Sequence, residues 1–301
     1  MTWLVTGGGG MLGTDVVARL DDVVAPRRAD LDLTDAGAVR DALRRHRPGV
    51  VVNCAAWTAV DDAETSEDAA LAVNGTAVEA LVAGCAEIGA KLVQVSTDYV
   101  FPGTATEPYP EDAPTAPVNA YGRTKLAGEA AVLGYERGYV VRTAWLYGAN
   151  GPSFARTMAR LAGERDTVEV VDDQAGQPTW TGDLADRIIA LARADAPAGA
   201  YHGTNAGRTT WYGLAREVFA LLGHDPDRVR ATTSEKFVRP AARPAFSVLG
   251  HGRWAAAGLP PLRGWQEALH AAWPSLTAAW PEAGGVVRPV AEPGFARERV
   301  T

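Results

Sequence analysis

Cysteine and histidine are scarce in this chain, and neither is arranged as a set of ligands. The two cysteines, Cys54 and Cys85, lie in apolar stretches and form no Cys-x-x-Cys pair. The five histidines never fall at metal-ligand spacing. These absences exclude a disulfide framework and a zinc site, and they predict a protein of the reducing cytoplasm.

An excess of positive charge and long apolar runs are also lacking. Among 301 residues, 29 Lys and Arg stand against 36 Asp and Glu, which gives a net charge of −7. Without a basic surface, the protein is not expected to bind nucleic acid. No apolar run reaches the roughly 18–20 residues of a membrane span, and no charged leader precedes the first one. We therefore expect neither a membrane anchor nor a signal peptide.

The composition is globular, 47% hydrophobic and 22% charged. In the first 150 residues, short apolar runs alternate with periodic Ala- and Leu-rich stretches that are typical of helices. The runs are 2–6, 23–25, 50–53, 92–96 and 139–142, and the stretches between them are 11–20, 35–45, 66–89 and 120–134. This alternation predicts βαβ units and a doubly wound parallel sheet in an α/β protein.

The pattern changes after about residue 150. Helical stretches at 153–163, 182–194, 211–222 and 264–272 are separated by Pro/Gly-rich loops at 172–180, 195–200, 239–245 and 258–264. We expect residues 1–150 to form the sheet domain, with returns to it at roughly 175–205. Residues 151–280 are expected to form a smaller α/β subdomain, and the tail 281–301 to pack little.

A glycine-rich turn follows the first apolar run. Gly7, Gly10 and Gly13 fit a Gly-x-x-Gly-x-x-Gly pattern, and Gly8-x-Gly10-x-x-Gly13 fits as well. Glycines permit a tight strand-to-helix turn, let a pyrophosphate approach backbone N–H groups, and allow close packing of the helix on the strand. Because this turn lies between a predicted strand and a predicted helix, it predicts a dinucleotide site.

The residues after the second apolar run bear on which dinucleotide is bound. Arg27 and Arg28 follow it, and guanidinium groups match a 2′-phosphate. The pair favours NADPH, with NADH possible, and two solvated surface arginines are the alternative. Asp32 and Leu33 come slightly later and could contact the adenine side.

A candidate catalytic set follows the fourth apolar run, which ends in Thr97-Asp98. Tyr121 and Lys125 are spaced i, i+4 and share one helix face. An adjacent ammonium is expected to lower the pKa of the phenol, which then protonates a carbonyl that receives hydride. Thr97 is placed to bind the same oxygen. A chance pair on a helix is the alternative, although Lys occurs only three times in the chain.

Several longer stretches carry a resemblance to a known family. The chain resembles the extended short-chain dehydrogenase/reductases, and within them the family of dTDP-4-dehydrorhamnose reductases, over roughly residues 1–275. The matching stretches are Gly7–Gly13, Val52–Asp61, Ser96–Phe101, Tyr121–Glu129, Arg142–Trp145, Asp173–Thr179 and Arg243-Pro244. The resemblance implies a Rossmann-like sheet domain and a substrate-binding C-terminal subdomain.

The resemblance also implies roles for individual residues. Thr97 and Asp98 would contact the sugar, Trp145 would pack against it, and Arg243 would reach the nucleotide diphosphate. Tyr121 and Lys125 would be catalytic and would also meet the cofactor. Gly10, Met11 and Leu12 would meet the cofactor pyrophosphate, Asp32 and Leu33 the adenine, and Ala56, Trp57 and Thr58 the cofactor and the pocket floor. We also expect cofactor contacts from Gly7, Gly13, Arg27, Arg28 and Ala55.

The implied reaction is NADPH-dependent reduction of the C4 ketone of dTDP-4-dehydro-β-L-rhamnose to dTDP-L-rhamnose. Reduction of a related dTDP-keto-sugar, such as a streptose precursor, stays open. Thr97-Asp98 is followed by Tyr99, so the second acid typical of the related dehydratases is missing. Epimerases, which keep NAD tightly bound, fit the arginine pair less well. A non-catalytic regulatory subunit, similar to that of methionine adenosyltransferase, would have no need of Thr97, Tyr121 and Lys125 together.

The chain departs from part of the family. Some members resemble dimers bridged by magnesium on glutamates, and here Asp15 and Gly182 stand at two of the matching places. Gly182 has no side chain to ligate a hard cation. We therefore expect no metal site, and a monomer or weak homodimer.

Overall fold

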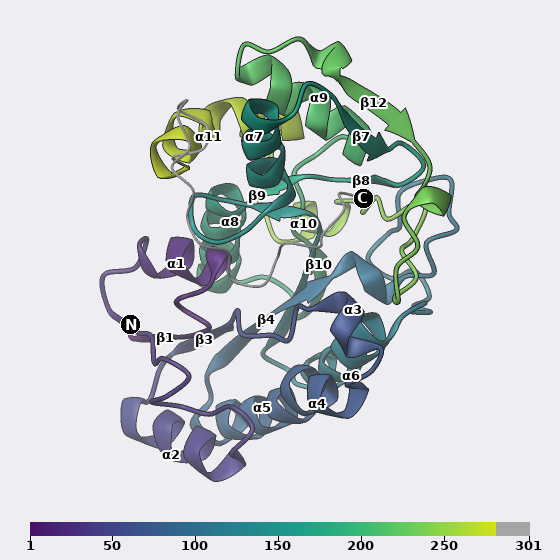
Figure 1. The fold of residues 1–301 in the computed structure, drawn as a ribbon. Coiled ribbons are helices and arrows are strands. Elements are labelled where there is room, and N and C mark those ends of the chain that lie inside the picture. Colours follow the sequence, from purple (N-terminus) through teal and green to yellow (C-terminus); the bar gives the residue numbers. More distant parts are fainter. Residues whose placement is uncertain (281–301) are drawn as a thin grey trace.

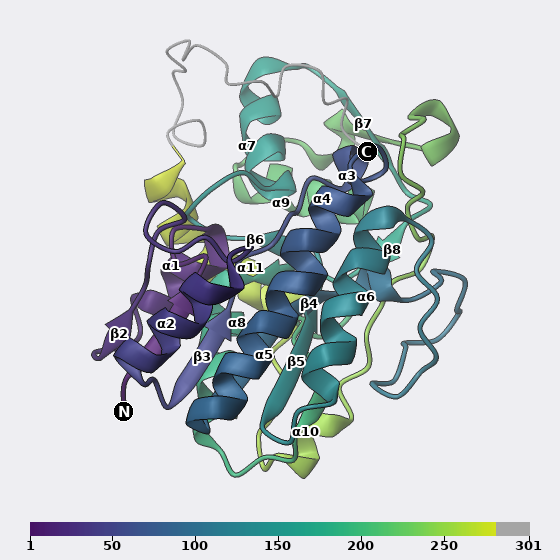
Figure 2. The same cartoon turned by 90° about the horizontal axis from the view of Figure 1, so that it is seen from below.

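The computed structural model describes residues 1–280 and shows a six-stranded parallel sheet with helices on both faces (Figures 1 and 2). The strand order is β10-β5-β4-β3-β1-β2. The strands are β1 (Trp3–Thr6), β2 (Val23–Val24), β3 (Val50–Asn53), β4 (Lys91–Thr97), β5 (Gly138–Thr143) and β10 (Gly199–His202). The predicted doubly wound sheet is confirmed, and the tail 281–301 lies outside the described residues.

The central strands are continuous apolar runs because both faces of the sheet are covered. All four residues of β1 and of β3 are buried, as are all six of β5. β1 pairs with β2 on one side and with β3 on the other. The chain therefore reverses direction across the sheet between β1 and β3, and open parallel sheets bind ligands at the carboxyl edge of such a switch point.

One face of the sheet is covered by helices from the first half of the chain, drawn in front of the strands in Figure 2. Their apolar sides pack on Leu4, Val51, Leu92 and Val140 of the strands. These helices are α2 (Ala36–His46), α4 (Glu67–Leu71), α5 (Ala77–Ile88) and α6 (Ala120–Leu133), with a π-helical turn at Ala72–Thr76 joining α4 to α5.

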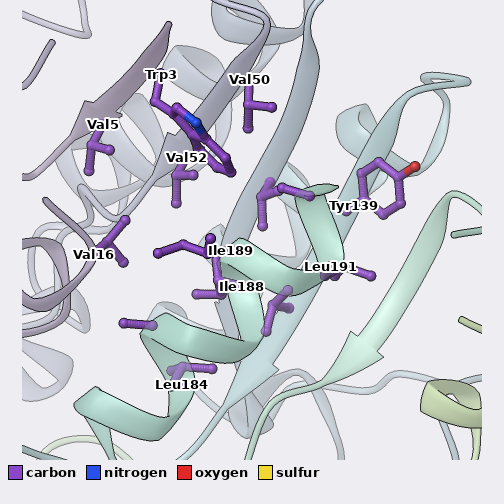
Figure 3. Close-up of a cluster of buried hydrophobic side chains, with 14 of the residues drawn as sticks. Trp3, Val5, Val16, Val50, Val52, Tyr139, Leu184, Ile188, Ile189 and Leu191 are labelled. Atoms are coloured by element: carbon purple, nitrogen blue, oxygen red, sulfur yellow. The ribbon is translucent and has the colours of Figure 1, made fainter. Parts of the chain in front are cut away.

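The opposite face is covered by α1 (Met11–Val17) and α8 (Thr181–Arg193), with the short α10 (Arg253–Ala256) near its edge. Figure 3 shows Leu184, Ile188 and Ile189 of α8 facing Val52 and Trp3 of the strands. Because α8 covers this face and β10 completes the sheet, the chain returns to the sheet domain after residue 180.

One helical run differs from the expectation of no membrane-length segment. Glu67–Ile88, which combines α4, the π-helical turn and α5, is long and apolar enough to cross a membrane by length and composition. Its apolar side is part of the core, where Val78, Leu81 and Cys85 are buried against the sheet. The expectation was wrong about length, and burial of this face explains the apolar composition.

The rest of the second half of the chain, apart from α8, β10 and α10, forms a smaller lobe above the carboxyl edge of the sheet (Figure 1). Its core includes Met158, Leu214, Phe219, Leu269 and Trp280. The lobe contains β6 (Leu146–Tyr147), α7 (Phe154–Glu164), β7 (Val168–Val171), β8 (Ala175–Gly176), β9 (Thr179–Trp180), β11 (Thr209–Thr210), α9 (Trp211–Leu221), β12 (Val229–Thr232) and α11 (Trp265–Ala279).

Three details of this half differ from the sequence prediction. The loop predicted at 172–180 contains β8 and β9, and the loop predicted at 195–200 leads into β10. α11 continues through Pro274 to Ala279, beyond the predicted end at residue 272. The helix continues because Leu276, and Trp280 directly after the end of the helix, are both buried in the core of the lobe.

A crossing segment, defined here as residues 239–250, joins the two lobes by backbone hydrogen bonds. Phe246 N donates to Gly103 O at 3.0 Å and Tyr109 N donates to Val248 O at 2.9 Å, which attaches the segment to the sheet domain. Ala175 N donates to Ala245 O at 2.8 Å, which attaches it to β8. The segment therefore runs between the lobes, past the carboxyl edge of β4.

Candidate active site

The glycine turn has two positions, Gly7 and Gly13, at which only glycine fits. Gly7 has a φ of +67°, and a Cβ on it would lie 2.6 Å from Ala55 N in the loop after β3. A Cβ on Gly13 would lie 2.1 Å from Gly7 O. Gly10 N donates to Gly7 O at 2.9 Å. The turn therefore packs the start of α1 closely against β1 and against the loop after β3, at the switch point of the sheet.

Met11 and Leu12, the next predicted cofactor residues, point in different directions. Leu12 is buried in the sheet core, so only its backbone is available to a ligand. The Met11 side chain lies beside Gly148 and Gly151, at the rim of the smaller lobe.

A row of polar side chains, which the sequence analysis missed, fixes the carboxyl edge of the sheet. Thr6 Oγ1 donates to Asn53 Oδ1 at 2.5 Å, and Asn53 Nδ2 donates to Gln94 Oε1 at 2.7 Å. Ala55 N also donates to Asn53 Oδ1, at 3.1 Å. The row joins β1, β3 and β4 and orients the predicted cofactor loop that begins at Ala55. The presence of these polar residues within apolar strands could have indicated such a row.

The loop after β3 is tied to the catalytic helix by another residue that sequence reasoning missed. Asn74 is buried; its Oδ1 accepts from Trp57 N at 2.9 Å, and its Nδ2 donates to Thr124 Oγ1 of α6 at 3.1 Å. Ala56 is half-buried and Thr58 is exposed in this loop. Asn74 thus couples the predicted cofactor loop to the helix of Tyr121.

The arginine pair lies on the surface near the glycine turn. Arg27 and Arg28 are exposed, and they follow Ala25, whose Cβ would meet a Cβ on Gly8 at 3.0 Å. Asp32 is exposed as well; hydrogen bonds from Thr34 hold its pKa below the usual value, and nearby Arg28 adds to this effect. Leu33, in contrast, packs partly against the core.

Tyr121, Lys125 and Thr97 meet at the carboxyl end of β4. Tyr121 is hydrogen-bonded to Thr97. The buried Lys125 donates from Nζ to Val95 O at 2.7 Å. Burial lowers the pKa of Lys125 to about 8, while the Glu129 carboxylate one turn further along α6 opposes the shift. The structure thus brings the three predicted catalytic side chains to one strand end.

The predicted lowering of the Tyr121 pKa is wrong. Burial raises the pKa of Tyr121, the hydrogen bond with Thr97 opposes this, and the charge of Asp98 adds to it. Lys125 does not offset the burial because its ammonium is turned to Val95 O. The phenol is therefore held protonated at neutral pH.

Asp98 lies next to this group in a 3₁₀ turn, Asp98–Val100, that ends β4. Its Oδ1 accepts from Thr97 Oγ1 at 3.0 Å. Burial raises the pKa of Asp98 to about 6, and hydrogen bonds from Ser247 and Thr97 work against the shift. The Tyr99 ring packs edge-on against the Tyr121 ring, with centroids 5.9 Å apart.

Trp145 follows β5 and has a φ of +47°, a backbone angle that residues other than glycine rarely adopt. Its indole stacks on Trp211 with ring centroids 3.6 Å apart and an interplanar angle of 9°. Trp211 Nε1 donates to Gln174 Oε1 at 3.1 Å, and a Cβ on Gly176 would strike the Trp145 ring. Trp145 and Trp211 thus form one stacked aromatic surface, of which the sequence analysis missed Trp211.

Arg243 lies in the crossing segment and faces α3 (Val60–Ala63). Its Nη2 lies 3.0 Å from Asp61 Oδ1, and Arg239 Nη1 lies 3.3 Å from Asp61 Oδ2. Arg239 and Asp61 were not among the predicted site residues, although Asp61 ends one of the matching stretches. Glu64, the C-cap of α3, also accepts from Ala120 N, at the start of α6, at 2.8 Å.

The residues at the family's magnesium position do not fit a divalent cation. One Asp15 oxygen accepts from Thr181 Oγ1 and the other lies 3.4 Å from Arg19 Nη1. A Cβ on Gly182 would collide with Trp180. Within residues 1–280, no group of three or more His, Cys, Asp or Glu could hold a metal ion.

The parallel sheet, the glycine turn at its switch point and a Tyr-x-x-x-Lys pair beside the β4 threonine define a class. The protein is an oxidoreductase of the short-chain dehydrogenase/reductase class. Comparison with known proteins places it further: a family model described as the RmlD substrate binding domain matches residues 1–277. The chain belongs to this family.

Two curated relatives and one solved structure show the degree of similarity. The chain is 57% identical over 284 residues to the dTDP-4-dehydrorhamnose reductase of Streptomyces griseus, covering 91% of this chain and 93% of the relative. It is 56% identical over 285 residues to the probable dTDP-4,6-dihydroxy-2-methyloxan-3-one 4-ketoreductase of Streptomyces antibioticus, covering 93% and 97%. The crystal structure of dTDP-4-dehydrorhamnose reductase from Bacillus anthracis in complex with NADP gives a TM-score of 0.87 at 35% identity, covering 91% of this chain and 99% of that chain.

Proposed function

We propose that the protein reduces the C4 ketone of dTDP-4-dehydro-β-L-rhamnose to dTDP-L-rhamnose with NADPH. The observation that carries the proposal is the meeting of Thr97, Tyr121 and Lys125 at the carboxyl end of β4, in the sheet whose switch point carries the glycine turn. The reductase names of the relatives and the NADP complex of a structural neighbour support it.

The residues at the switch point fit a dinucleotide. Gly7 and Gly13 permit the close packing of β1, α1 and the loop after β3 that forms this turn, and the backbone of Gly10, Met11 and Leu12 is placed to meet the pyrophosphate. Arg27 and Arg28 are exposed and can take the 2′-phosphate, with Asp32 and Leu33 toward the adenine. Ala55, Ala56 and Thr58 follow β3 and face the same edge. When bound, NADPH supplies the hydride.

Tyr121 supplies the proton in this proposal. A phenol whose pKa is raised by burial enters the reaction protonated and can donate to the alkoxide oxygen at C4. Thr97 shares a hydrogen bond with Tyr121 and holds the same oxygen. Lys125, mostly charged at neutral pH with a pKa of about 8, orients the cofactor ribose.

The substrate side is formed by residues from both lobes. Asp98 of the sheet domain is placed to accept hydrogen bonds from sugar hydroxyls, and Trp145 with Trp211 forms an apolar wall for the ring. Arg243 is placed for the diphosphate. Binding of these remote groups fixes the ketone near the phenol.

A second candidate function is reduction of a related dTDP-4-keto-sugar, such as a streptose precursor. It is favoured by the 56% identity to the probable ketoreductase from Streptomyces antibioticus, whose named substrate differs. A non-catalytic regulatory subunit is disfavoured, since it would have no use for the hydrogen-bonded Thr97 and Tyr121.

The proposal is tested by mixing the purified protein with a panel of dTDP-4-keto-hexuloses and either NADPH or NADH. Absorbance of the reduced nicotinamide should fall fastest with dTDP-4-dehydro-β-L-rhamnose and NADPH. Tyr121→Phe should lower kcat by about 100-fold or more while the Kd for NADPH changes little. Absence of oxidation with every keto-sugar would refute the reductase proposal, and a faster rate with another hexulose would favour the second candidate.

We propose further that residues 1–150, with the returns at 175–205, bind the cofactor, and that 151–280 mainly bind the substrate. The free thiols of Cys54 and Cys85 suit a reducing cytoplasm; burial raises the pKa of both to about 12, which keeps them unreactive. Because Asp15 is engaged by Thr181 and Arg19, we propose a monomer or weak homodimer without bridging magnesium.

A further inference from the structure

Asp61 lies between two guanidinium groups that reach it from the crossing segment. The carboxylate pairs with Arg243 at 3.0 Å and with Arg239 at 3.3 Å. Its Oδ1 also accepts from Ala241 N, between the two arginines, at 3.2 Å. Its side chain is only 26% exposed. One carboxylate thus holds three points of residues 239–243, and the proposed reduction assigns it no step.

The same short stretch of chain is attached to the catalytic helix. Asn119 Nδ2 donates to Ala242 O at 2.8 Å, while Asn119 Oδ1 caps α6 by accepting from Gly122 N at 2.8 Å. Both Arg243 and Asp61 lie close enough to Tyr99 to influence its pKa, and the Tyr99 ring packs on Tyr121. The Tyr99 ring therefore lies near Arg243 and packs on the proton donor.

A cavity of about 150 Å³ opens beside these arginines. Arg239 and Arg243 line it together with Gln174, Phe237 and Val238. Arg243 donates to Ala241 O and to Asp61, and a guanidinium group has more N–H donors than these two contacts use. The cavity thus offers two cations and an apolar wall to a ligand that lies beside the active-site tyrosine.

We propose that Asp61 is a positioning residue that holds Arg239 and Arg243 together as a clamp for the diphosphate of the nucleotide-sugar substrate. The proposal rests on the proposed function. Two long side chains lose conformational entropy when they bind one ligand. Because Asp61 already orders both arginines in the free protein, ligand binding costs less of this entropy. The clamp has two cations, so it also sets the preference for a nucleoside diphosphate over a monophosphate.

The test compares Asp61→Asn with Asp62→Asn, a matched control that removes the same charge from the neighbouring exposed residue of α3. Asp61→Asn should raise the Kd for dTDP, measured by calorimetry, and the KM for the keto-sugar by about tenfold. The Kd for dTMP should rise less, and kcat and the Kd for NADPH should stay within about threefold of wild type. Asp62→Asn should match wild type in every measurement.

An Arg239→Gln/Arg243→Gln variant completes a double-mutant cycle. Asp61→Asn should add no further loss of dTDP affinity in that background. Unchanged or tighter dTDP binding by Asp61→Asn would overturn the proposal, because it would make the carboxylate a bystander or a competitor of the phosphates. If Asp61→Asn unfolds, the arginine variant with Asp61 intact must by itself lose dTDP affinity and the preference over dTMP. Wild-type protein that binds dTDP but reduces no keto-sugar would refute the proposed function alone.

Discussion

At the residue scale, the active-site groups differ in which protonation state burial favours. Burial raises the pKa of Tyr121 and keeps its proton on, whereas it lowers the pKa of Lys125 to about 8. It also raises the pKa of Asp98 to about 6. Between these last two values, Asp98 is mostly ionised and Lys125 mostly charged. A phenol that is protonated at neutral pH is suited to reduction, since the donor starts with its proton.

The lysine pKa predicts the alkaline limb of the reduction. Lys125 loses its charge as the pH rises through about 8, so kcat/KM for NADPH-dependent reduction should fall by about tenfold for each unit above that pH. Lys125→Met should lower kcat/KM by about 100-fold and remove this limb. Steady-state rates from pH 6 to pH 10 measure both, and a limb that persists in Lys125→Met would assign it to another group.

At the scale of the element, the glycine turn gives a sharp contrast between neighbouring positions. A Cβ on Gly13 would meet Gly7 O at 2.1 Å, whereas nothing lies within 4 Å of a Cβ on Gly9. Gly13→Ala should therefore push α1 away from β1 and raise the Kd for NADPH by about tenfold or more. Gly9→Ala is the control, and fluorescence titration with NADPH measures both. Equal affinities would show that the turn does not form the cofactor site.

The sequence predicts those elements whose own apolar pattern indicates that they are buried. The apolar runs 50–53 and 92–96 predict β3 and most of β4, because continuous apolar runs are typical of buried parallel strands. β8 and β9, with two residues each, exist only through pairing with distant segments, so no local pattern predicts them. Thr97, Tyr121 and Lys125, in contrast, lie in local motifs, so they could be predicted from spacing and family resemblance. The Asp61–Arg239 contact, between residues 178 positions apart, could not.

At the scale of the whole molecule, a buried polar group joins the sheet to the crossing segment. Arg142 of β5 forms a buried ion pair with Glu129 of α6 at 2.8 Å. His202 of β10 lies 3.4 Å from Arg142 Nη1, and its Nδ1 lies 2.8 Å from Gly250 O. Burial, with Arg142 nearby, lowers the pKa of His202 to about 3. The native protein therefore holds this histidine neutral.

This group predicts how stability depends on acid. The unfolded chain binds a proton at His202 near pH 6.5, whereas the folded one does so only near pH 3. The contribution of His202 is therefore present above pH 6.5 and is lost as the pH falls toward 3, by at most about 1.4 kcal/mol per unit. His202→Gln should flatten the dependence of the urea unfolding free energy on pH between 6.5 and 4. The exposed His270→Gln is the control, and equal slopes for both variants would contradict the prediction. Asp98 acts in the opposite sense between pH 3.8 and about 6, so only the comparison between variants isolates His202.

The crossing segment has a consequence for how a ligand enters. Its hydrogen bonds to Gly103, Tyr109 and Ala175 attach both lobes to the same short stretch of chain. A movement that separated the lobes would have to break these hydrogen bonds. A nucleotide therefore has to enter while the two lobes stay close to this separation.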